Sequence, residues 1–277
     1  MAYYADERRY FEEIAMHGQK KRFLFEGDSW FSIMDLANIP LQFDSRLDLS
    51  ILCLADPGDT LEDLADGRQF DILERLIKNE RHGQKWDALF FSAGGNDIVG
   101  PEIKGLLKTP ADPGSTDPAD YLDDAAVKET FRQMRQRFVA LKALRDKSKA
   151  NPDTPIFIHT YSYLTPRNVA HRVLAWKVSG PWVFPHMTHR GIDDCALQQK
   201  IVRHLLNGFH DMLKGIADEP GANFHVIDTR KALTPVACAA RDSDFELWRD
   251  EIHPSSKGFA HITEKFLIPF VKDKGVV

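Results

Sequence analysis

Five short apolar runs recur along the chain, and most of them end on small or polar residues. Each run is nearly continuous instead of alternating between hydrophobic and polar positions. That pattern is typical of strands buried on both faces of a sheet. We therefore predict five buried strands, which cover Arg22–Phe25, Ser50–Ala55, Trp86–Phe91, Pro155–His159 and Asn223–Asp228.

Between these runs, apolar residues recur every three or four positions, which is the pattern of amphipathic helices. Thr60 is followed by Asp63 three residues later, which resembles a capping box at the start of a helix. The clearest stripe consists of Val127, Phe131, Met134, Phe138 and Leu141. Further helices are predicted around Glu7–Met16, from Leu61 to Leu76, from Leu197 to Ile216, and from Phe259 to Phe266 before Pro269.

Strands that alternate with helices predict parallel β-α-β units, with helices on both faces of one sheet. No linker or repeat divides the chain, so we predict one domain over residues 1–277. Two long connections, about 109–120 and 165–194, are predicted as loop insertions. Both follow strands and should lie at the carboxyl edge of the sheet, where open α/β folds bind ligands.

Composition narrows the class of protein. Hydrophobic residues make up 43% of the chain and charged residues 28%, as in ordinary globular proteins. The net charge of −5 and the lack of a basic stripe argue against a nucleic-acid partner. No apolar run approaches the roughly 18 residues of a membrane-spanning helix, and the first residues do not resemble a signal peptide. We therefore expect no membrane insertion and, as the simplest location, the cytoplasm.

The cysteines and histidines give no sign of a metal. Cys53, Cys195 and Cys238 have no metal-like spacing, and an odd set of this kind predicts free, buried thiols in a reducing compartment. His186 and His189 are three residues apart and have no third ligand nearby. We expect neither a metal nor a cofactor.

The ends of the predicted strands and a block near the C-terminus carry the candidate chemistry. Acyl transfer by a serine needs a nucleophile, a base and donors for the oxyanion. Ser29 follows the first strand, and His253 could take its proton because histidine titrates near neutral pH. Asp250, three residues earlier, could hold the far ring nitrogen. The backbone N–H groups of Ser29 and Gly58 and the amide of Asn96 could bind the oxyanion.

Four blocks in this order resemble those of the GDSL, or SGNH, hydrolase superfamily. They are GDSW, the glycine of DPGDT, GGND and DEIHP, and the resemblance runs from about residue 21 to residue 258. It implies a flavodoxin-like three-layer fold and a metal-independent esterase, lipase, thioesterase or carbohydrate deacetylase. The matching residues are Ser29, Gly58, Asn96 and His253, with Asp250 as the third member of a catalytic triad.

We therefore predict an α/β/α sandwich with a five-stranded parallel sheet in the order 2-1-3-4-5. The predicted activity is serine hydrolysis of a small-molecule carboxylic ester through an acyl-enzyme, favouring a short-chain or carbohydrate O-acetyl ester. A lipase, lysophospholipase or thioesterase with a longer acyl pocket is the alternative. Trp30, where leucine is commoner in the family, is predicted to shape the pocket. Trp182, Phe184 and Met187 form either its apolar wall or a packed core within the loop.

A non-catalytic binding module is the alternative from another class. Gly58 and the pair Gly94-Gly95, at predicted helix starts, could hold a phosphate or nucleotide. Neither segment matches a P-loop or a G-x-G-x-x-G motif, and this alternative leaves the DEIHP block unexplained. The α/β-hydrolase alternative fails because no serine lies in a G-x-S-x-G motif.

Overall fold

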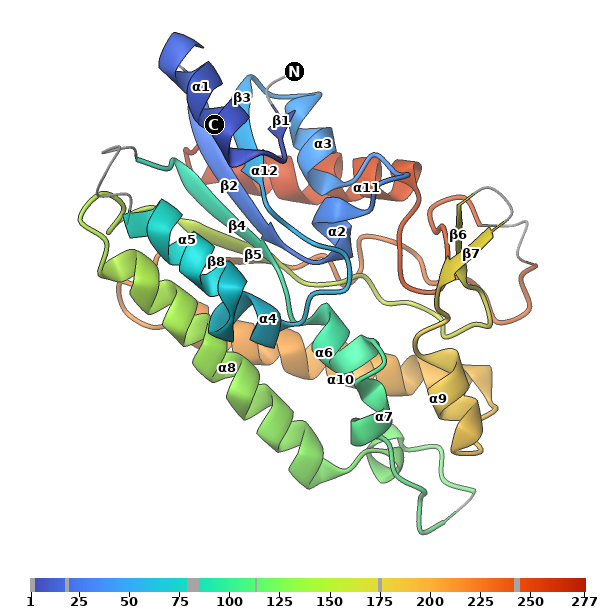
Figure 1. Cartoon of the computed structure of the whole chain (residues 1–277). Coiled ribbons are helices and arrows are strands. Elements are labelled where there is room, and N and C mark those ends of the chain that lie inside the picture. Colours follow the sequence, from blue (N-terminus) through green and yellow to red (C-terminus); the bar gives the residue numbers. More distant parts are fainter. Residues whose placement is uncertain (1–2, 18–19, 79–84, 113, 174–175, 242–244) are drawn as a thin grey trace.

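The centre of the molecule is a parallel sheet. The computed structural model describes residues 3–17, 20–78, 85–112, 114–173, 176–241 and 245–277. Six strands lie in the order β1-β3-β2-β4-β5-β8, and all neighbours are parallel (Figure 1). They are β1 (Tyr3–Tyr4), β2 (Lys21–Gly27), β3 (Leu49–Cys53), β4 (Ala88–Ser92), β5 (Ile156–His159) and β8 (Phe224–Ile227).

Five of these strands are those that the apolar runs predict, and they lie in the predicted order. β3, β4 and β5 are buried along their whole length, as expected of a sheet covered on both faces. The sixth, β1, was not predicted and adds an edge strand beyond β3. Its two residues are too few to show a pattern of their own.

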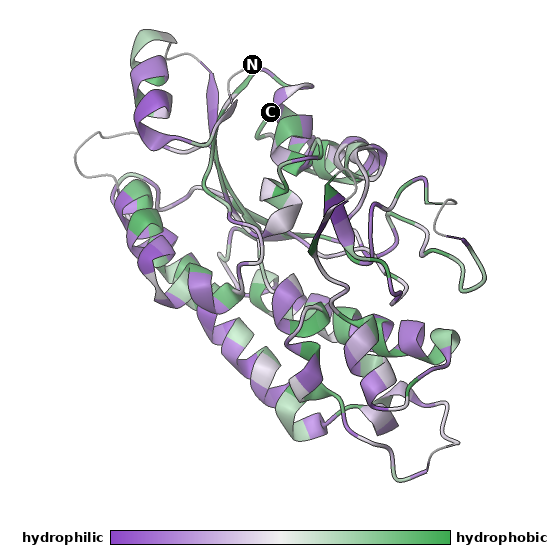
Figure 2. Ribbon diagram, turned by 45° about the vertical axis from the view of Figure 1, so that its right-hand side comes forward, coloured by the Kyte–Doolittle hydropathy of each residue, from purple (hydrophilic) through white to green (hydrophobic). Residues whose placement is uncertain are grey.

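Helices cover both faces of this sheet and complete a three-layer α/β/α fold (Figure 1). They are α1 (Glu7–His17), α2 (Ser29–Ser32), α3 (Ile39–Asp44), α4 (Leu61–Asp66), α5 (Arg68–Lys78), α6 (Gly95–Val99), α7 (Ile103–Leu106), α8 (Asp124–Asp146), α9 (Phe184–His189), α10 (Cys195–Ala217), α11 (Ser256–Ile262) and α12 (Ile268–Asp273). One layer contains α4, α5, α8 and α10, and the other contains α3, α11 and α12. Figure 2 shows hydrophobic and hydrophilic residues mixed on these helices, as amphipathic helices require. Within the described part of the chain, no helix is long and apolar enough to cross a membrane.

Two predicted helices differ from the structure. The helix predicted from Leu61 to Leu76 is divided at Gly67 into α4 and α5, because glycine weakens a helix interior. Thr60 does form the predicted capping box with Asp63. The last helix does not end before Pro269. It continues through a π-helical turn into α12, where proline occupies the first turn and needs no N–H partner.

Both long connections contain structure of their own. Residues 109–120 lead into a 3₁₀ turn at Pro118–Tyr121. Residues 165–194, called the insertion below, contain an antiparallel hairpin and α9. The hairpin strands are β6 (His171–Val173) and β7 (Trp176–Ser179), which are too short for their alternation to stand out in the sequence. Figure 1 shows the hairpin next to the coil that follows β8.

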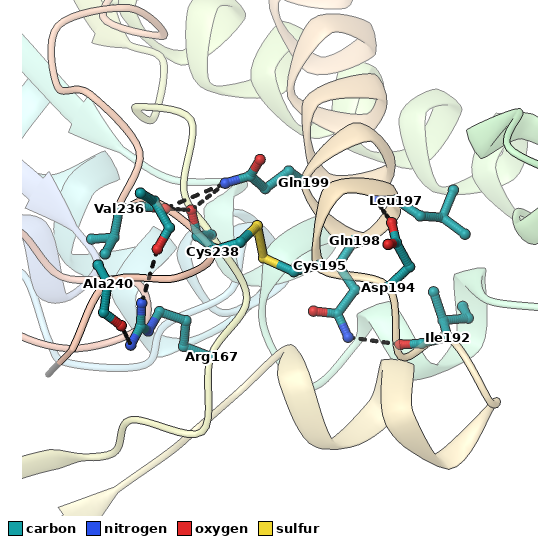
Figure 3. Close-up of a disulfide and its surroundings, with 12 residues drawn as sticks. Arg167, Ile192, Asp194, Cys195, Leu197, Gln198, Gln199, Val236, Cys238 and Ala240 are labelled. Atoms are coloured by element: carbon teal, nitrogen blue, oxygen red, sulfur yellow. Dashed lines mark hydrogen bonds between the residues drawn. A yellow bond between two sulfur atoms is a disulfide. The ribbon is translucent and has the colours of Figure 1, made fainter.

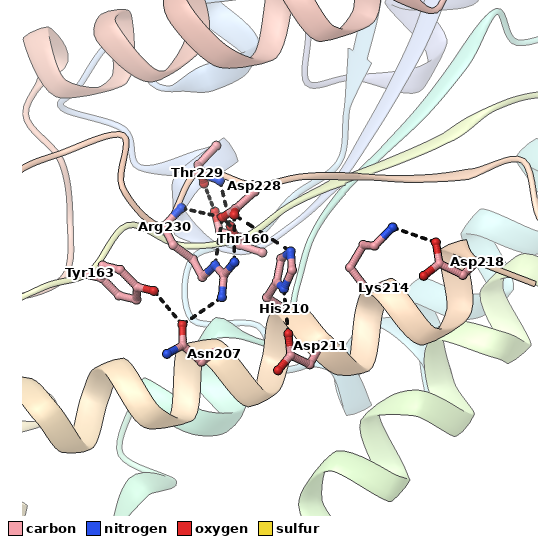
Figure 4. Close-up of polar contacts among 10 residues, drawn as sticks. All are labelled: Thr160, Tyr163, Asn207, His210, Asp211, Lys214, Asp218, Asp228, Thr229 and Arg230. Carbon is pink, nitrogen blue, oxygen red and sulfur yellow. Dashed lines mark hydrogen bonds and ion pairs between the residues drawn. The ribbon is translucent and has the colours of Figure 1, made fainter.

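Polar contacts tie the segments after β5 and β8 to α10 (Figure 4). Arg230 binds Asp228 and donates to Asn207 at 2.8 Å. Tyr163 donates to the same Asn207 oxygen at 2.6 Å. The chain therefore leaves both strand ends along a defined path toward the insertion.

A disulfide joins Cys195 and Cys238, with 2.05 Å between the sulfur atoms (Figure 3). The prediction of three free thiols was wrong, and the inference of a reducing compartment that rested on it is withdrawn. Cys53 alone is free, and it is buried. The two bonded cysteines are 43 residues apart in sequence. They meet because the coil after β8 passes the start of α10, a path that no spacing rule reveals.

Candidate active site

The turn after β2 presents Ser29. Gly27 has φ +145°, and a Cβ there would lie 2.0 Å from the carbonyl oxygen of Ser92 in β4. Only glycine fits this close approach. Asp28 caps α2, because its side chain accepts the Trp30 N–H at 3.0 Å. Ser29 is therefore the first helical residue, at the carboxyl end of β2.

His253 and Asp250 lie against this serine. Nε2 of His253 is 2.7 Å from Oγ of Ser29, and Nδ1 is 2.9 Å from both carboxylate oxygens of Asp250. All three side chains are buried. A carboxylate accepts hydrogen bonds and donates none, so Nδ1 carries a proton and Nε2 can accept the Ser29 hydroxyl proton. The structure therefore brings together the three residues that the sequence predicts as a triad.

The Asp250 carboxylate is held in place and kept ionised. Its Oδ1 accepts the N–H groups of Ile252 at 3.0 Å and His253 at 2.8 Å. Burial acts to raise the pKa of Asp250. The charge of His253 and hydrogen bonds from His171 and His253 outweigh burial, and the pKa lies well below its usual range.

Asn96 lines a cavity next to Ser29, and Gly58 is not among the described residues that line it. Asn96 lies in α6, which follows β4, and its Nδ2 donates to the carbonyl oxygen of Asp59 at 2.7 Å. Together with Ser29 it lines a cavity. Gly58 is exposed, has φ +93°, and is not among the described residues that line this cavity.

The cavity beside Ser29 is small, with a volume of about 10 Å³. That is roughly the room for one water molecule. Hollows of about 470 Å³ and 410 Å³ exist elsewhere, but Ser29 lines neither of them. The wall of the small cavity is mainly apolar and includes Trp30, Val99, Tyr161, Leu164 and Ile252.

Trp30 forms part of this wall and is packed from three sides. Its ring stacks on His159 at 5.3 Å between centroids and meets the edges of Tyr161 at 5.0 Å and Phe259 at 5.7 Å. Because these three rings pack against it, Trp30 is a fixed boundary of the cavity. Burial lowers the pKa of His159 to about 4.

Asp28 lies buried directly behind the nucleophile candidate. Its carboxylate accepts hydrogen bonds from the Tyr161 hydroxyl and from Ser92 Oγ, the latter at 2.7 Å. Burial raises the pKa of Asp28 to about 6, although these bonds oppose the shift. Sequence reasoning missed Ser92 and Tyr161. Their one signal is position, because Ser92 ends β4 and Tyr161 closely follows β5.

The three aromatic and apolar residues predicted in the insertion have different surroundings. The Trp182 ring is 5.0 Å from the His253 ring, in an edge-on arrangement. Phe184 is half-buried at the start of α9. Met187 is fully buried within the hydrophobic core and does not line the cavity at Ser29.

The Glu251 carboxylate holds the insertion in place through hydrogen bonds to its backbone. Its Oε2 accepts the N–H groups of Trp182 and of Val183, the latter at 2.9 Å. Its Oε1 accepts those of Phe184 at 2.7 Å and Arg167 at 3.2 Å. Burial raises the pKa of Glu251 to about 7, against the effect of these four bonds. One buried carboxylate therefore sets the course of residues 182–184.

His171 of β6 contacts Asp250 through Oδ2, an oxygen that His253 also contacts. Its Nδ1 is 2.8 Å from Oδ2 of Asp250. His171, Asp250 and His253 are the one group in the described ranges whose ligand atoms lie close enough, within 4.8 Å, for a metal ion. These atoms already hydrogen-bond one another. No sequence pattern marks His171, because periodicity does not predict its hairpin.

Some solved structures of other proteins are similar to this chain. No protein-family model and no curated protein matches the chain. Among solved structures, a protein from Slackia heliotrinireducens whose description names the SGNH hydrolases is 12% identical over 89% of this chain and 97% of that chain, with a TM-score of 0.48. A family 3 carbohydrate esterase from Talaromyces cellulolyticus is 14% identical over 91% and 99%, with a TM-score of 0.42. A psychrotrophic esterase from Pseudoalteromonas sp. is 13% identical over 91% and 97%, with a TM-score of 0.43.

The chain is thus similar to one protein described as an SGNH hydrolase and to two proteins described as esterases. Identities of 14% or less and TM-scores below 0.5 carry no argument about activity. The site geometry is the basis for assigning a function.

Proposed function

We propose that the protein is a serine hydrolase of carboxylic esters, with Ser29 as the nucleophile. The observation that carries this proposal is the chain of hydrogen bonds from Asp250 through His253 to Ser29. In this chain, Nε2 of His253 is 2.7 Å from Oγ of Ser29. A serine hydroxyl is a weak nucleophile until a hydrogen-bonded base removes its proton. This chain of hydrogen bonds supplies His253 as that base at the carboxyl edge of the sheet.

The reaction has two halves. Oγ of Ser29 attacks the ester carbonyl carbon while its proton moves to Nε2 of His253, and Asp250 stabilises the imidazolium. His253 then protonates the leaving alcohol, and the acyl group stays on Ser29. In the second half, His253 takes a proton from water as the water oxygen attacks the acyl carbon. The bond from that carbon to Oγ then breaks, His253 returns the proton to Oγ of Ser29, and the carboxylic acid leaves.

Two groups are best placed to stabilise the oxyanion. As the first residue of α2, Ser29 has a backbone N–H with no partner inside the helix. Asn96 gives one amide hydrogen to Asp59, which leaves the second for the substrate. Gly58 stays a predicted third donor. Its exposed position ranks it behind the other two.

A short acyl group fits the site better than a long one. The cavity of about 10 Å³ has fixed walls, including the packed ring of Trp30. An acetyl group needs much less additional room than a long acyl chain, which needs a channel. Met187, a predicted wall residue, is buried in the core. We therefore favour a short-chain ester, including the carbohydrate O-acetyl ester predicted from the family resemblance, over a lipase substrate.

A fluorophosphonate probe tests the nucleophile. The wild type should be labelled on Ser29, and Ser29→Ala should lose both the label and hydrolysis of p-nitrophenyl acetate. Ser32→Ala, three residues further along α2, is the matched control and should keep both. Labelling that persists in Ser29→Ala means that the nucleophile is another residue.

A series of p-nitrophenyl esters tests the acyl group. We expect kcat/KM to be highest for chains of two to four carbons and to decline beyond them. Highest activity on chains of eight carbons or more would replace the short-chain proposal with the lipase alternative.

A further inference from the structure

His171 is a buried histidine that the proposed reaction does not use. It lies in β6 of the insertion, and its ring centroid is 5.7 Å from that of His253. Both rings contact the same carboxylate, because Nδ1 of each approaches Oδ2 of Asp250, at 2.8 Å and 2.9 Å. Asp250 is thus shared between two imidazoles.

Both nitrogens of the His171 ring face carboxylate oxygens. Nδ1 faces Oδ2 of Asp250 at 2.8 Å, and Nε2 faces Oδ1 of Asp35 at 3.2 Å. A carboxylate donates no hydrogen bond, so a neutral ring with one N–H satisfies only one of these contacts. An imidazolium, with an N–H on each nitrogen, satisfies both.

The surrounding charges support the imidazolium. The hydrogen bond and negative charge of Asp250 and the charge of Asp35 raise the pKa of His171, whereas burial and the Arg249 guanidinium lower it, and the net shift is upward. The Arg249 guanidinium donates to the Arg172 carbonyl oxygen at 2.5 Å and lies 3.5 Å from Oδ2 of Asp35, so it shares the Asp35 carboxylate with His171.

We propose that His171 is a positioning residue which, as an imidazolium, moderates the base His253 through their shared carboxylate. This inference rests on the proposed function. The N–H of His171 holds Oδ2 of Asp250 while backbone N–H groups hold Oδ1, which prevents rotation of the carboxylate. The positive charge of His171 also offsets part of the negative charge that Asp250 presents to His253. Asp250 therefore holds a proton on His253 less firmly than an unshared aspartate would, and catalysis extends to lower pH.

Two substitutions separate orientation from charge. In His171→Asn, the amide N–H can replace Nδ1–H toward Asp250 without the positive charge, whereas His171→Leu removes both. We expect the acid limb of the kcat/KM profile to move up by about 1 pH unit in both variants. The plateau kcat should stay within about twofold of wild type in His171→Asn and fall about tenfold in His171→Leu. His189→Asn, at an exposed histidine of α9, is the control and should change neither.

Proton NMR measures the effect of His171 on His253 without requiring catalysis. In the Ser29→Ala background, adding His171→Asn should move the Nδ1 proton resonance of His253 downfield, because Asp250 becomes a stronger acceptor. An unmoved acid limb together with an unmoved resonance overturns the inference. If the resonance moves and the wild type hydrolyses no ester, the coupling stands and the proposed function fails. His171→Asn keeps the test decisive even if His171→Leu does not fold.

Discussion

Two regions meet at His253, and they are held in place by different means. Ser29 and Asn96 follow β2 and β4, whose backbones are paired to neighbouring strands in the middle of the sheet. His171 and Trp182 belong to the insertion, which lies outside that sheet. The first region depends on strand pairing and apolar packing, whereas the second combines apolar packing, as at Met187, with a few buried polar contacts.

Adjacent carboxylates provide most of those contacts, and their environments differ. Asp250 faces two imidazole rings, and its pKa lies well below the usual range. Glu251 faces only neutral backbone N–H groups, and burial raises its pKa to about 7. Positive partners offset the cost of burying a charge more fully than peptide N–H groups do. The stability of the insertion should therefore depend on pH and on the Glu251 side chain.

Removal of an oxyanion donor from the strand-end region should have the largest effect. Asn96→Ala should lower kcat by roughly 10²–10³-fold with little change in KM, because the donor acts mainly in the transition state. Steady-state kinetics with p-nitrophenyl acetate measure this. Asn207→Ala, in α10, is the control. An unchanged kcat would remove Asn96 from the mechanism.

Loss of the disulfide, which lies next to the end of the insertion, should lower the stability of the fold without a comparable loss of activity. In the double variant Cys195→Ser and Cys238→Ser, the free energy of unfolding should fall by about 2–4 kcal/mol, because the open loop has more freedom when unfolded. Urea unfolding measures the change, and wild type with a thiol reductant should reproduce it. Identical midpoints for both proteins would show that the bond does not stabilise the fold.

Glu251→Ala should loosen the insertion selectively. Four backbone N–H groups lose their acceptor, and we expect the free energy of unfolding to fall by about 1–3 kcal/mol. Hydrogen exchange should accelerate at residues 182–184 and stay unchanged in β2 and β4. Glu246→Ala, at an exposed glutamate, is the control. Equal acceleration in the sheet would contradict the difference between the two regions.

The smallest expected effect is in the pH dependence of stability. The pKa of Glu251 is about 7 in the folded state against 4.5 as its ordinary value. The folded protein therefore binds more protons, and this contribution to stability is complete below about pH 4.5 and is lost as pH rises through 7. Relative to Glu251→Gln, the wild type should lose stability with a slope of at most about 1.4 kcal/mol per pH unit. Parallel stability curves would contradict the raised pKa.

Much of the strand-end region could be predicted from the sequence. Ser29, Asn96 and His253 stand in short blocks next to predictable elements, and the ends of parallel strands converge at one edge. The contacts of Tyr161 and His171 could not be found in this way. Tyr161 meets Asp28 across 133 residues, and His171 meets Asp250 across 79. Such contacts depend on the path of irregular segments, which periodicity does not describe.

By itself, the sequence determined the alternation of strands and helices, the order of the five main strands and the blocks that resemble a serine hydrolase. The alternation follows from local patterns of hydrophobic residues, whereas the strand order follows from the family that the four blocks resemble. The tertiary structure alone decided that Cys195 bonds Cys238 and that Met187 is buried in the core. It also decided that Glu251, next to the predicted Asp250, accepts the backbone N–H groups of the insertion. The three-residue spacing to His253 marks Asp250 in the sequence, whereas only the fold brings the partners of Glu251 to it.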